Sequence, residues 1–283
     1  TKTGLETKRA RVVIDASGDA NAVAFPGFPL NIPKDVQPAT LSCRASGYDC
    51  DALDLDAINR AYEAEVQTGT LRYTDAGWNT ERANVAQWLR AGGGNANHTH
   101  HINARDSEGK SRLEMESRKG LLRLFRFLKR QPGLENLVID SVSPECGVRE
   151  TVTIQGKKTI AAADYRSGRV WEDSICHAFY PIDLHRSSGD GLGKAPLREG
   201  IVPTVPRGAL LPAGSRNLVV AGRCVSSDRL ANSALRVQAS CMAMGQAAGA
   251  MAALASRTGV DPEQVPIDDL RAVLRQHGAI VPE

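Results

Sequence analysis

The residues best suited to chemistry lie in one stretch near the carboxyl end of the chain. It opens with a short apolar strand, Leu218–Ala221, which stops at Gly222 and leads into a polar loop. A long helix of small residues is predicted from about Ser233 to Ala255, and Asn232 and Ser233 suit its N-cap. The first N–H groups of a helix have no internal acceptor, and the helix dipole makes that end partly positive. The pattern predicts a helix N-terminus directed at an anionic or dipolar ligand.

This long helix also has simpler interpretations. The uncharged run Val237–Ala255 is close to the length of a membrane span. Gln238, Ser240 and Gln246 interrupt it, however, and no aromatic belt flanks it. We therefore expect no membrane span, and a buried helix without a ligand remains the alternative.

A second strand and turn of the same kind lie near the amino end. Val12–Ile14 is an apolar strand, and Ser17, Gly18 and Asp19 follow it within a run of small residues. A glycine-containing turn lets a bulky ligand approach the backbone closely. Any connection from a strand to a helix can carry the same residues, so the turn alone does not establish a site.

Three histidines, His98, His100 and His101, follow the glycine run 92–94 in a polar loop. Histidines at this spacing can bind a metal ion, and a metal hydrolase is the corresponding function. No carboxylate or cysteine stands at ligand spacing with them. We therefore expect no metal, and favour a loop that faces a substrate.

The segment AGRCVSSDRLANSALRVQASCMAMGQAAG, which ends at Gly249, resembles the C-terminal signature of a known family. That family comprises FAD-dependent oxidoreductases with the glutathione-reductase type of FAD fold. The residues on its pattern are Arg223, Cys224, Arg236, Cys241, Met242, Gly245, Gln246 and Gly249. Gly147–Thr151 (GVRET) and Tyr180–His185 (YPIDLH) resemble two further motifs of the family.

The resemblance implies an α/β fold with FAD as the cofactor. The expected architecture is an incomplete FAD-binding Rossmann-like domain of the glutathione-reductase type, with an inserted α+β substrate domain. The corresponding segments are a partial FAD segment 1–30, a substrate or cap domain 31–200, a returning FAD segment 201–256 and a C-terminal helix 257–283.

The resemblance also implies roles for individual residues. His185 is the expected catalytic base for a substrate hydroxyl, and Arg149 is expected to hold a carboxylate or another oxygen-rich group. Hydride passes to the flavin, and a cation or the helix N-terminus faces the negative charge that develops there. The residues expected to bind the cofactor are Ser17, Gly18, Asp19, Gly222, Arg223, Cys224, Ser233, Leu235 and Arg236. A small packing residue is an equal interpretation of Cys224.

The chain departs from the family pattern in three places. Ser17 replaces the usual threonine, and Val205–Pro212 lacks the family's tyrosine, which predicts a different cavity or substrate. No G-x-G-x-x-G motif follows a strand, although such a unit binds the pyrophosphate in this fold. We therefore expect a fragment, or a subunit whose N-terminal nucleotide-binding segment or partner supplies that unit.

Composition narrows the function class further. The net charge of +3 is too small to indicate nucleic-acid binding. The six cysteines form no C-x-x-C pair, which favours reduced thiols and a cytoplasmic location. A homo-oligomer is compatible with the sequence.

Outside the motifs, periodicity predicts the remaining elements. We expect a hairpin within 1–10 and helices over 51–68, 111–130, 171–178 and 265–278. Strands are expected over 41–47, 136–142 and 152–154, with a loop over 164–170.

Together these features predict part or a subunit of a flavin-dependent dehydrogenase or oxidase. It would move hydride from an oxygen-rich small molecule to FAD. The alternative is a non-catalytic structural or partner-binding subunit with a degenerate flavin fold.

Overall fold

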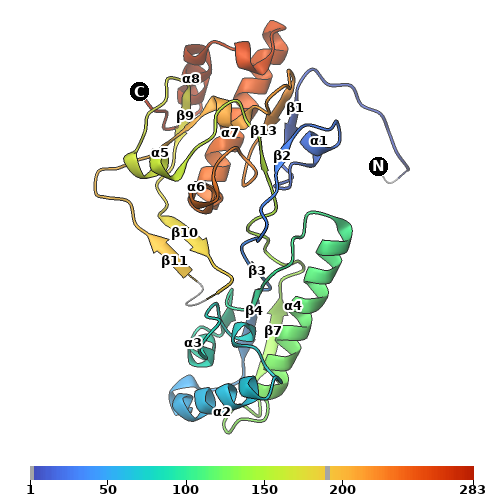
Figure 1. Ribbon diagram of the computed structural model, residues 1–283, viewed down its shortest axis with the longest axis vertical. Helices are drawn as coiled ribbons and strands as arrows, with labels where there is room; N and C mark the ends of the chain where they lie inside the picture. The colour runs from blue at the N-terminus through green and yellow to red at the C-terminus, as the bar shows by residue number, and fades with distance from the viewer. Residues whose placement is uncertain (1–2, 189–191) are drawn as a thin grey trace. The chain divides into compact units, whose positions relative to one another are not determined.

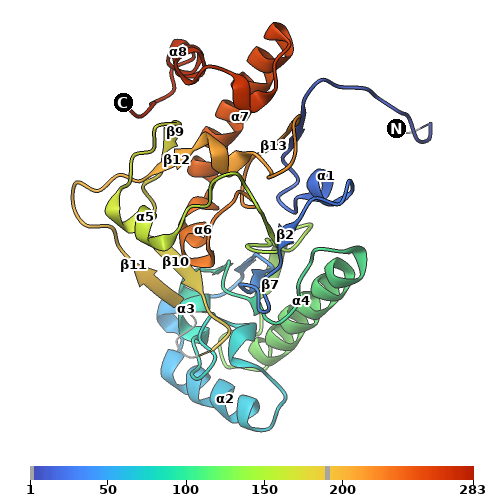
Figure 2. The ribbon, with the colours of Figure 1, turned by 45° about the horizontal axis from the view of Figure 1, so that its top comes forward.

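The computed structural model describes residues 3–188 and 192–283, which divide into two units (Figures 1 and 2). Unit 1 comprises the chain up to residue 32 together with 152–182 and 195–283. Unit 2 comprises 33–151 and the described residues of 183–194. The expected boundary near residue 31 lies beside the observed one. Residues 152–182, however, belong to unit 1 and not to the substrate domain to which we had assigned them.

Pairing between distant strands explains this difference. Strand β8 (Thr153–Ile154) pairs antiparallel with β2 (Leu30–Asn31), and so returns the chain to unit 1. The next segment was also predicted wrongly. Residues 162–167 form helix α5 (Ala162–Ser167) where a loop was expected from 164, and β9 (Ser174–His177) occupies the expected helix 171–178. Because β9 pairs antiparallel with β12 (Thr204–Pro206), tertiary pairing determines its conformation.

Unit 1 contains a parallel strand pair that matters for the site. In β1 (Val13–Asp15) and β13 (Leu218–Val220), Val13 pairs with Leu218 and Asp15 with Val220. Helix α7 contacts both strands, and helix α8 packs on α7 (Figure 1). The other elements of unit 1 are α1 (Asn21–Ala24), η3 (Arg207–Leu210), α6 (Arg229–Leu235), α7 (Gln238–Thr258), η4 (Pro262–Gln264) and α8 (Ile267–Gln276). The described residues of the expected hairpin, 3–10, hold no strand, and residues 1 and 2 lie outside the described part.

The predicted long helix is two helices. Helix α6 ends before Arg236, and Val237 is extended, with φ −70° and ψ 152°, before α7 begins. Asn232 and Ser233 are therefore interior residues of α6 and not N-caps. The N-cap of α6 is Asp228, whose carboxylate accepts from the Ala231 N–H at 2.8 Å.

Unit 2 has a core of its own, built around helix α4 (Ser107–Leu128). The N-cap of α4 is Asp106, which accepts from the Gly109 N–H, so the helix begins four residues before the predicted start. Its buried face includes Leu113, Leu124 and Phe127, and the Phe127 ring meets that of Tyr62 edge-on. The remaining elements of unit 2 are β3 (Ala39–Thr40), β4 (Cys43–Ser46), η1 (Cys50–Ala52), α2 (Leu55–Gln67), η2 (Tyr73–Asp75), α3 (Val85–Arg90), β5 (Gly93–Gly94), β6 (His98–Thr99) and β7 (Val138–Val142). Two paired strands, β10 (Ile182–His185) and β11 (Leu192–Ala195), each span the division between the units.

Candidate functional site

The carboxyl ends of β1 and β13 form the first candidate site, in unit 1. Parallel strands present their carboxyl ends at one edge, where α/β folds bind ligands. Both strands lead into turns with left-handed glycines, Gly18 at φ +78° and Gly222 at φ +102°. Arg223 Nη2 donates to Asp19 Oδ1 at 2.7 Å and joins the two turns. The structure therefore brings together two segments that the sequence separates by about 200 residues.

Ser17 has a structural part in this site. Its hydroxyl donates to Asp15 Oδ1 at 2.6 Å and accepts from the N–H groups of Asp19 and Asn21. The other oxygen of Asp15 accepts from Ala22 and Val23, at the start of α1. Asp15 thus fixes the whole turn. Sequence reasoning missed this aspartate, although an acidic residue that ends an apolar strand was a usable signal.

Among the other predicted cofactor residues of unit 1, three are buried and Arg236 is partly exposed. Cys224, Ser233 and Leu235 are buried, and burial raises the pKa of the Cys224 thiol to about 12. The Ser233 hydroxyl donates to the Leu230 carbonyl, so it forms this hydrogen bond within α6. Arg236 lies between α6 and α7, at the helix break.

Asn232, which we had predicted only as a cap, supports the loop that carries Arg223. Its side-chain amide donates to the Arg223 carbonyl at 2.7 Å and to the Ser227 hydroxyl at 3.1 Å. The side chain is buried, so this contact fixes the backbone after Gly222.

The second candidate site lies in unit 2, where Arg149, His98 and His185 meet. Arg149 Nη2 lies 3.4 Å from His98 Nε2, and the His98 and His185 rings are 5.1 Å apart, edge to face. Strand β3 holds this arrangement, because Thr40 pairs with His98 on one side and with Gly147 on the other. Arg149 Nη1 also donates to the Thr40 hydroxyl at 2.7 Å and to the Pro38 carbonyl.

His185 is positioned by polar neighbours. Its Nε2 lies 3.5 Å from Asp183 Oδ2, and its backbone N–H donates to Gln37 Oε1 at 3.2 Å. The Gln37 N–H in turn donates to Glu150 Oε2, so GVRET and YPIDLH are joined through one glutamine. Gln37 carries no motif signal in the sequence.

His98 and His100 are neutral near pH 7. Burial, together with the nearby Arg149 guanidinium, lowers the pKa of His98 to about 2. Burial and the neighbouring His101 lower the pKa of His100 to about 4, against a smaller opposing effect of Asp35. Neutral imidazoles act as hydrogen-bond donors and acceptors at once.

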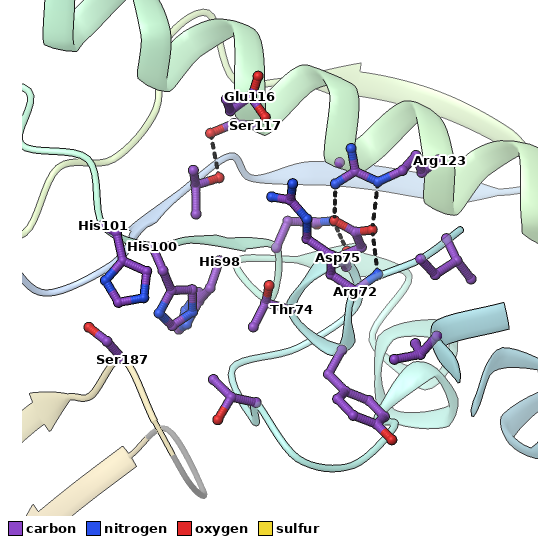
Figure 3. Close-up of a pocket in the computed structure, with 17 residues that line it drawn as sticks. Arg72, Thr74, Asp75, His98, His100, His101, Glu116, Ser117, Arg123 and Ser187 are labelled. Carbon is purple, nitrogen blue, oxygen red and sulfur yellow. Dashed lines mark hydrogen bonds and ion pairs between the residues drawn. The ribbon is translucent and has the colours of Figure 1, made fainter. Parts of the chain in front are cut away.

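Both histidines line a cavity of about 410 Å³ within unit 2 (Figure 3). His98, His100 and His101 lie on one side, with Ser187 beside them, and the Asp75–Arg123 ion pair lies on the other. This ion pair is bidentate, with N···O distances of 2.7 and 3.0 Å. In the described residues, no three potential ligands are grouped so that they could hold a metal ion.

A family model described as FAD dependent oxidoreductase matches residues 1–274. The chain belongs to this family. No curated protein and no solved structure matched the oxidoreductase in the other two comparisons. The resemblance of its C-terminal signature to FAD-dependent oxidoreductases is thereby confirmed at the level of the family.

FAD is therefore the cofactor of the oxidoreductase. The turns after β1 and β13 fit a flavin, because the N–H groups of Gly18, Gly222 and Arg223 donate to no described residue. A Cβ added at Gly222 would meet no atom within 4 Å, so there is room in front of this turn. The buried Arg223 Nε also lacks a hydrogen-bond partner.

Among the described helices, none has the length and apolar character that crossing a membrane requires.

Proposed function

We propose that this chain is part, or a subunit, of a flavin-dependent dehydrogenase or oxidase that oxidises an oxygen-rich small molecule. The observation that carries the proposal is the convergence of Arg149 and His185 on His98. A cation and an imidazole held this close can bind one oxygen of a substrate and deprotonate another. FAD, when bound, supplies the acceptor for the hydride.

His185 acts as the base in this proposal. Its Nε2 faces Asp183 at 3.5 Å, so Nδ1 is the nitrogen that takes the proton of the substrate hydroxyl. Asp183 orients the ring and stabilises the imidazolium that forms, as a carboxylate does for a catalytic histidine. Arg149, fixed by Pro38 and Thr40, supplies the positive charge that attracts an oxygen-rich substrate.

We assign the flavin to the turns Ala16–Asp19 and Gly222–Cys224 of unit 1. The N–H groups of Gly18, Gly222 and Arg223 are available there, and Arg223 supplies positive charge. The predicted helix N-terminus at Ser233 is wrong, because Ser233 lies inside α6, and no flavin contact is assigned to it.

We also propose that a nucleotide-binding βαβ segment, in the same polypeptide or in a partner, completes a glutathione-reductase-type fold. Two apolar side chains of β1, Val13 and Ile14, are exposed, and so is Met242 on α7. A further strand and helix would cover these side chains. The cytoplasm is the proposed location, in keeping with six free thiols.

The test is the colour of the purified protein, prepared with the segment just upstream and also without it. The proposal predicts a yellow protein whose flavin spectrum bleaches on reduction when that segment is present. A stable but colourless assembly that takes up no added FAD would contradict it. That result would favour the non-catalytic alternative.

A further inference from the structure

The cavity of unit 2 has a chemical character that the proposed roles of Arg149 and His185 do not use. Apart from its histidines, its lining holds two cations, Arg72 and Arg123, and two anions, Asp75 and Glu116. Arg123 is engaged by both oxygens of Asp75, so it is not available to hold an anionic ligand. At about 410 Å³, the cavity falls within the ~300–1,000 Å³ range of small-molecule sites.

His98 lines this cavity, and its buried ring carries an unmet hydrogen-bond donor. Arg149 can only donate, so His98 Nε2 accepts from it and the proton of the neutral ring sits on Nδ1. The His98 side chain is 5% exposed, and Nδ1 has no partner in the described protein. A buried donor without an acceptor is costly, which favours a ligand that supplies an oxygen there.

His100, two residues after His98, also has ring nitrogens without hydrogen-bond partners in the described protein. As a neutral imidazole it offers one donor and one acceptor. Hydroxyl groups extend this surface, because Thr99 and Ser117 form a hydrogen-bonded pair at 2.7 Å on the cavity wall (Figure 3).

We propose that this cavity binds a small neutral polyhydroxylated molecule, a monosaccharide or a sugar alcohol, against the wall formed by His98, Thr99, His100 and Ser117. Each hydroxyl of such a ligand donates and accepts, which matches neutral imidazoles and paired side-chain hydroxyls. The lining charges cancel, so a carboxylate gains little there. This assignment goes beyond the proposed function, because the residues that line the cavity include neither Arg149 nor His185.

The experiment is calorimetric titration of the full-length, FAD-loaded protein with D-glucose, D-glucitol and myo-inositol, and with D-gluconate as the charged counterpart. We expect at least one neutral polyol to bind more tightly than gluconate. His100→Leu should weaken this binding by about 10-fold or more, because a polar ligand loses its partners. His277→Asn, which changes a histidine of unit 1, should leave it unchanged.

His98→Leu can affect folding, so the second measurement uses the unmodified protein. Histidine NMR should show the His98 and His100 ring signals shifting as the polyol is added. Preference for gluconate, or polyol binding that His100→Leu does not change, would overturn the assignment.

The two proposals fail in different ways. Polyol binding to a protein that takes up no FAD would remove the proposed redox function and leave the binding site. A flavin that a substrate reduces, in a protein that binds no polyol, would keep the redox function and overturn the site.

Discussion

Arg149 donates through Nη2 to the neutral imidazole of His98, 3.4 Å away. Arg149 of the GVRET motif is thus held by a histidine from the loop that carries His98, His100 and His101. The sequence did not predict a contact between that loop and the motif. Because His98 must accept at Nε2, replacing it with glutamine should preserve an acceptor, whereas His98→Leu should not.

We predict that exchange of the Arg149 guanidinium protons is accelerated about 10-fold in His98→Leu but little changed in His98→Gln. Nitrogen NMR of the arginine side chains measures this directly. Equal acceleration in both variants would mean that the shape of the histidine, and not its acceptor, holds Arg149.

The low pKa of His98 predicts a loss of stability in acid. The unfolded chain takes up a proton on this histidine near pH 6.5, whereas the folded chain resists protonation down to a pKa of about 2. Below pH 6.5 the unfolded state binds more protons, so the unfolding free energy falls as the pH falls. His98→Gln should make this fall shallower by about 1.4 kcal/mol per pH unit between about pH 6 and pH 4.

Denaturant unfolding of both proteins across this range checks the prediction. Near about pH 8 the histidine is neutral in both states, so there the two curves should run parallel. Identical slopes in acid would show that His98 is not the group responsible.

Gly18 is predicted to keep Arg223 in place at the cofactor turn. An alanine Cβ there would lie 2.7 Å from Arg223 Cζ, and would push the guanidinium away from Asp19. Gly27 has a similar φ, +87°, but open space around it, so Gly27→Ala is a control with backbone strain alone. Fluorescence titration should show FAD affinity reduced about 10-fold in Gly18→Ala, about 1.4 kcal/mol, and nearly unchanged in Gly27→Ala. An equal loss of FAD affinity in the two variants would mean that backbone strain, and not the displaced Arg223, causes the loss.

Removing one partner of the Asp75–Arg123 ion pair should destabilise unit 2, because it leaves a partly buried charge unpaired. Asp75 is 5% exposed, and it also accepts from the Arg72 N–H. Asp75→Asn should cost about 3 kcal/mol of unfolding free energy, the lower end for a buried pair because Arg123 is 28% exposed. Glu65→Gln breaks the exposed pair with Arg130 and should cost less than about 1 kcal/mol. Comparable losses in chemical denaturation would contradict this ranking.

The sequence predicted the two strand-and-turn segments of unit 1. The apolar strands near Val13 and Leu218, each followed by a glycine turn, were recognisable because strand, glycine and small residues are contiguous. Arg149 and His185 stood out through the resemblance of short motifs. Whether these residues bind substrate or flavin remains a prediction.

The sequence did not predict features that depend on distant partners. The break at Val237 falls within a stretch that the sequence predicted as one helix, and neither proline nor glycine stands at the break to mark it. Asp75 and Arg123 lie 48 residues apart in different elements, so no periodicity links them. Strand β9 occupies a predicted helix because β12 pairs with it, a contact that only the folded chain contains.

The account depends most on the flavin binding at the carboxyl ends of β1 and β13. A crystal structure of the FAD-loaded protein, with its nucleotide-binding segment present, tests this directly. We predict the isoalloxazine ring within hydrogen-bond distance of the N–H groups of Gly18, Gly222 or Arg223. A flavin bound elsewhere, with both turns left bare, would contradict the central claim.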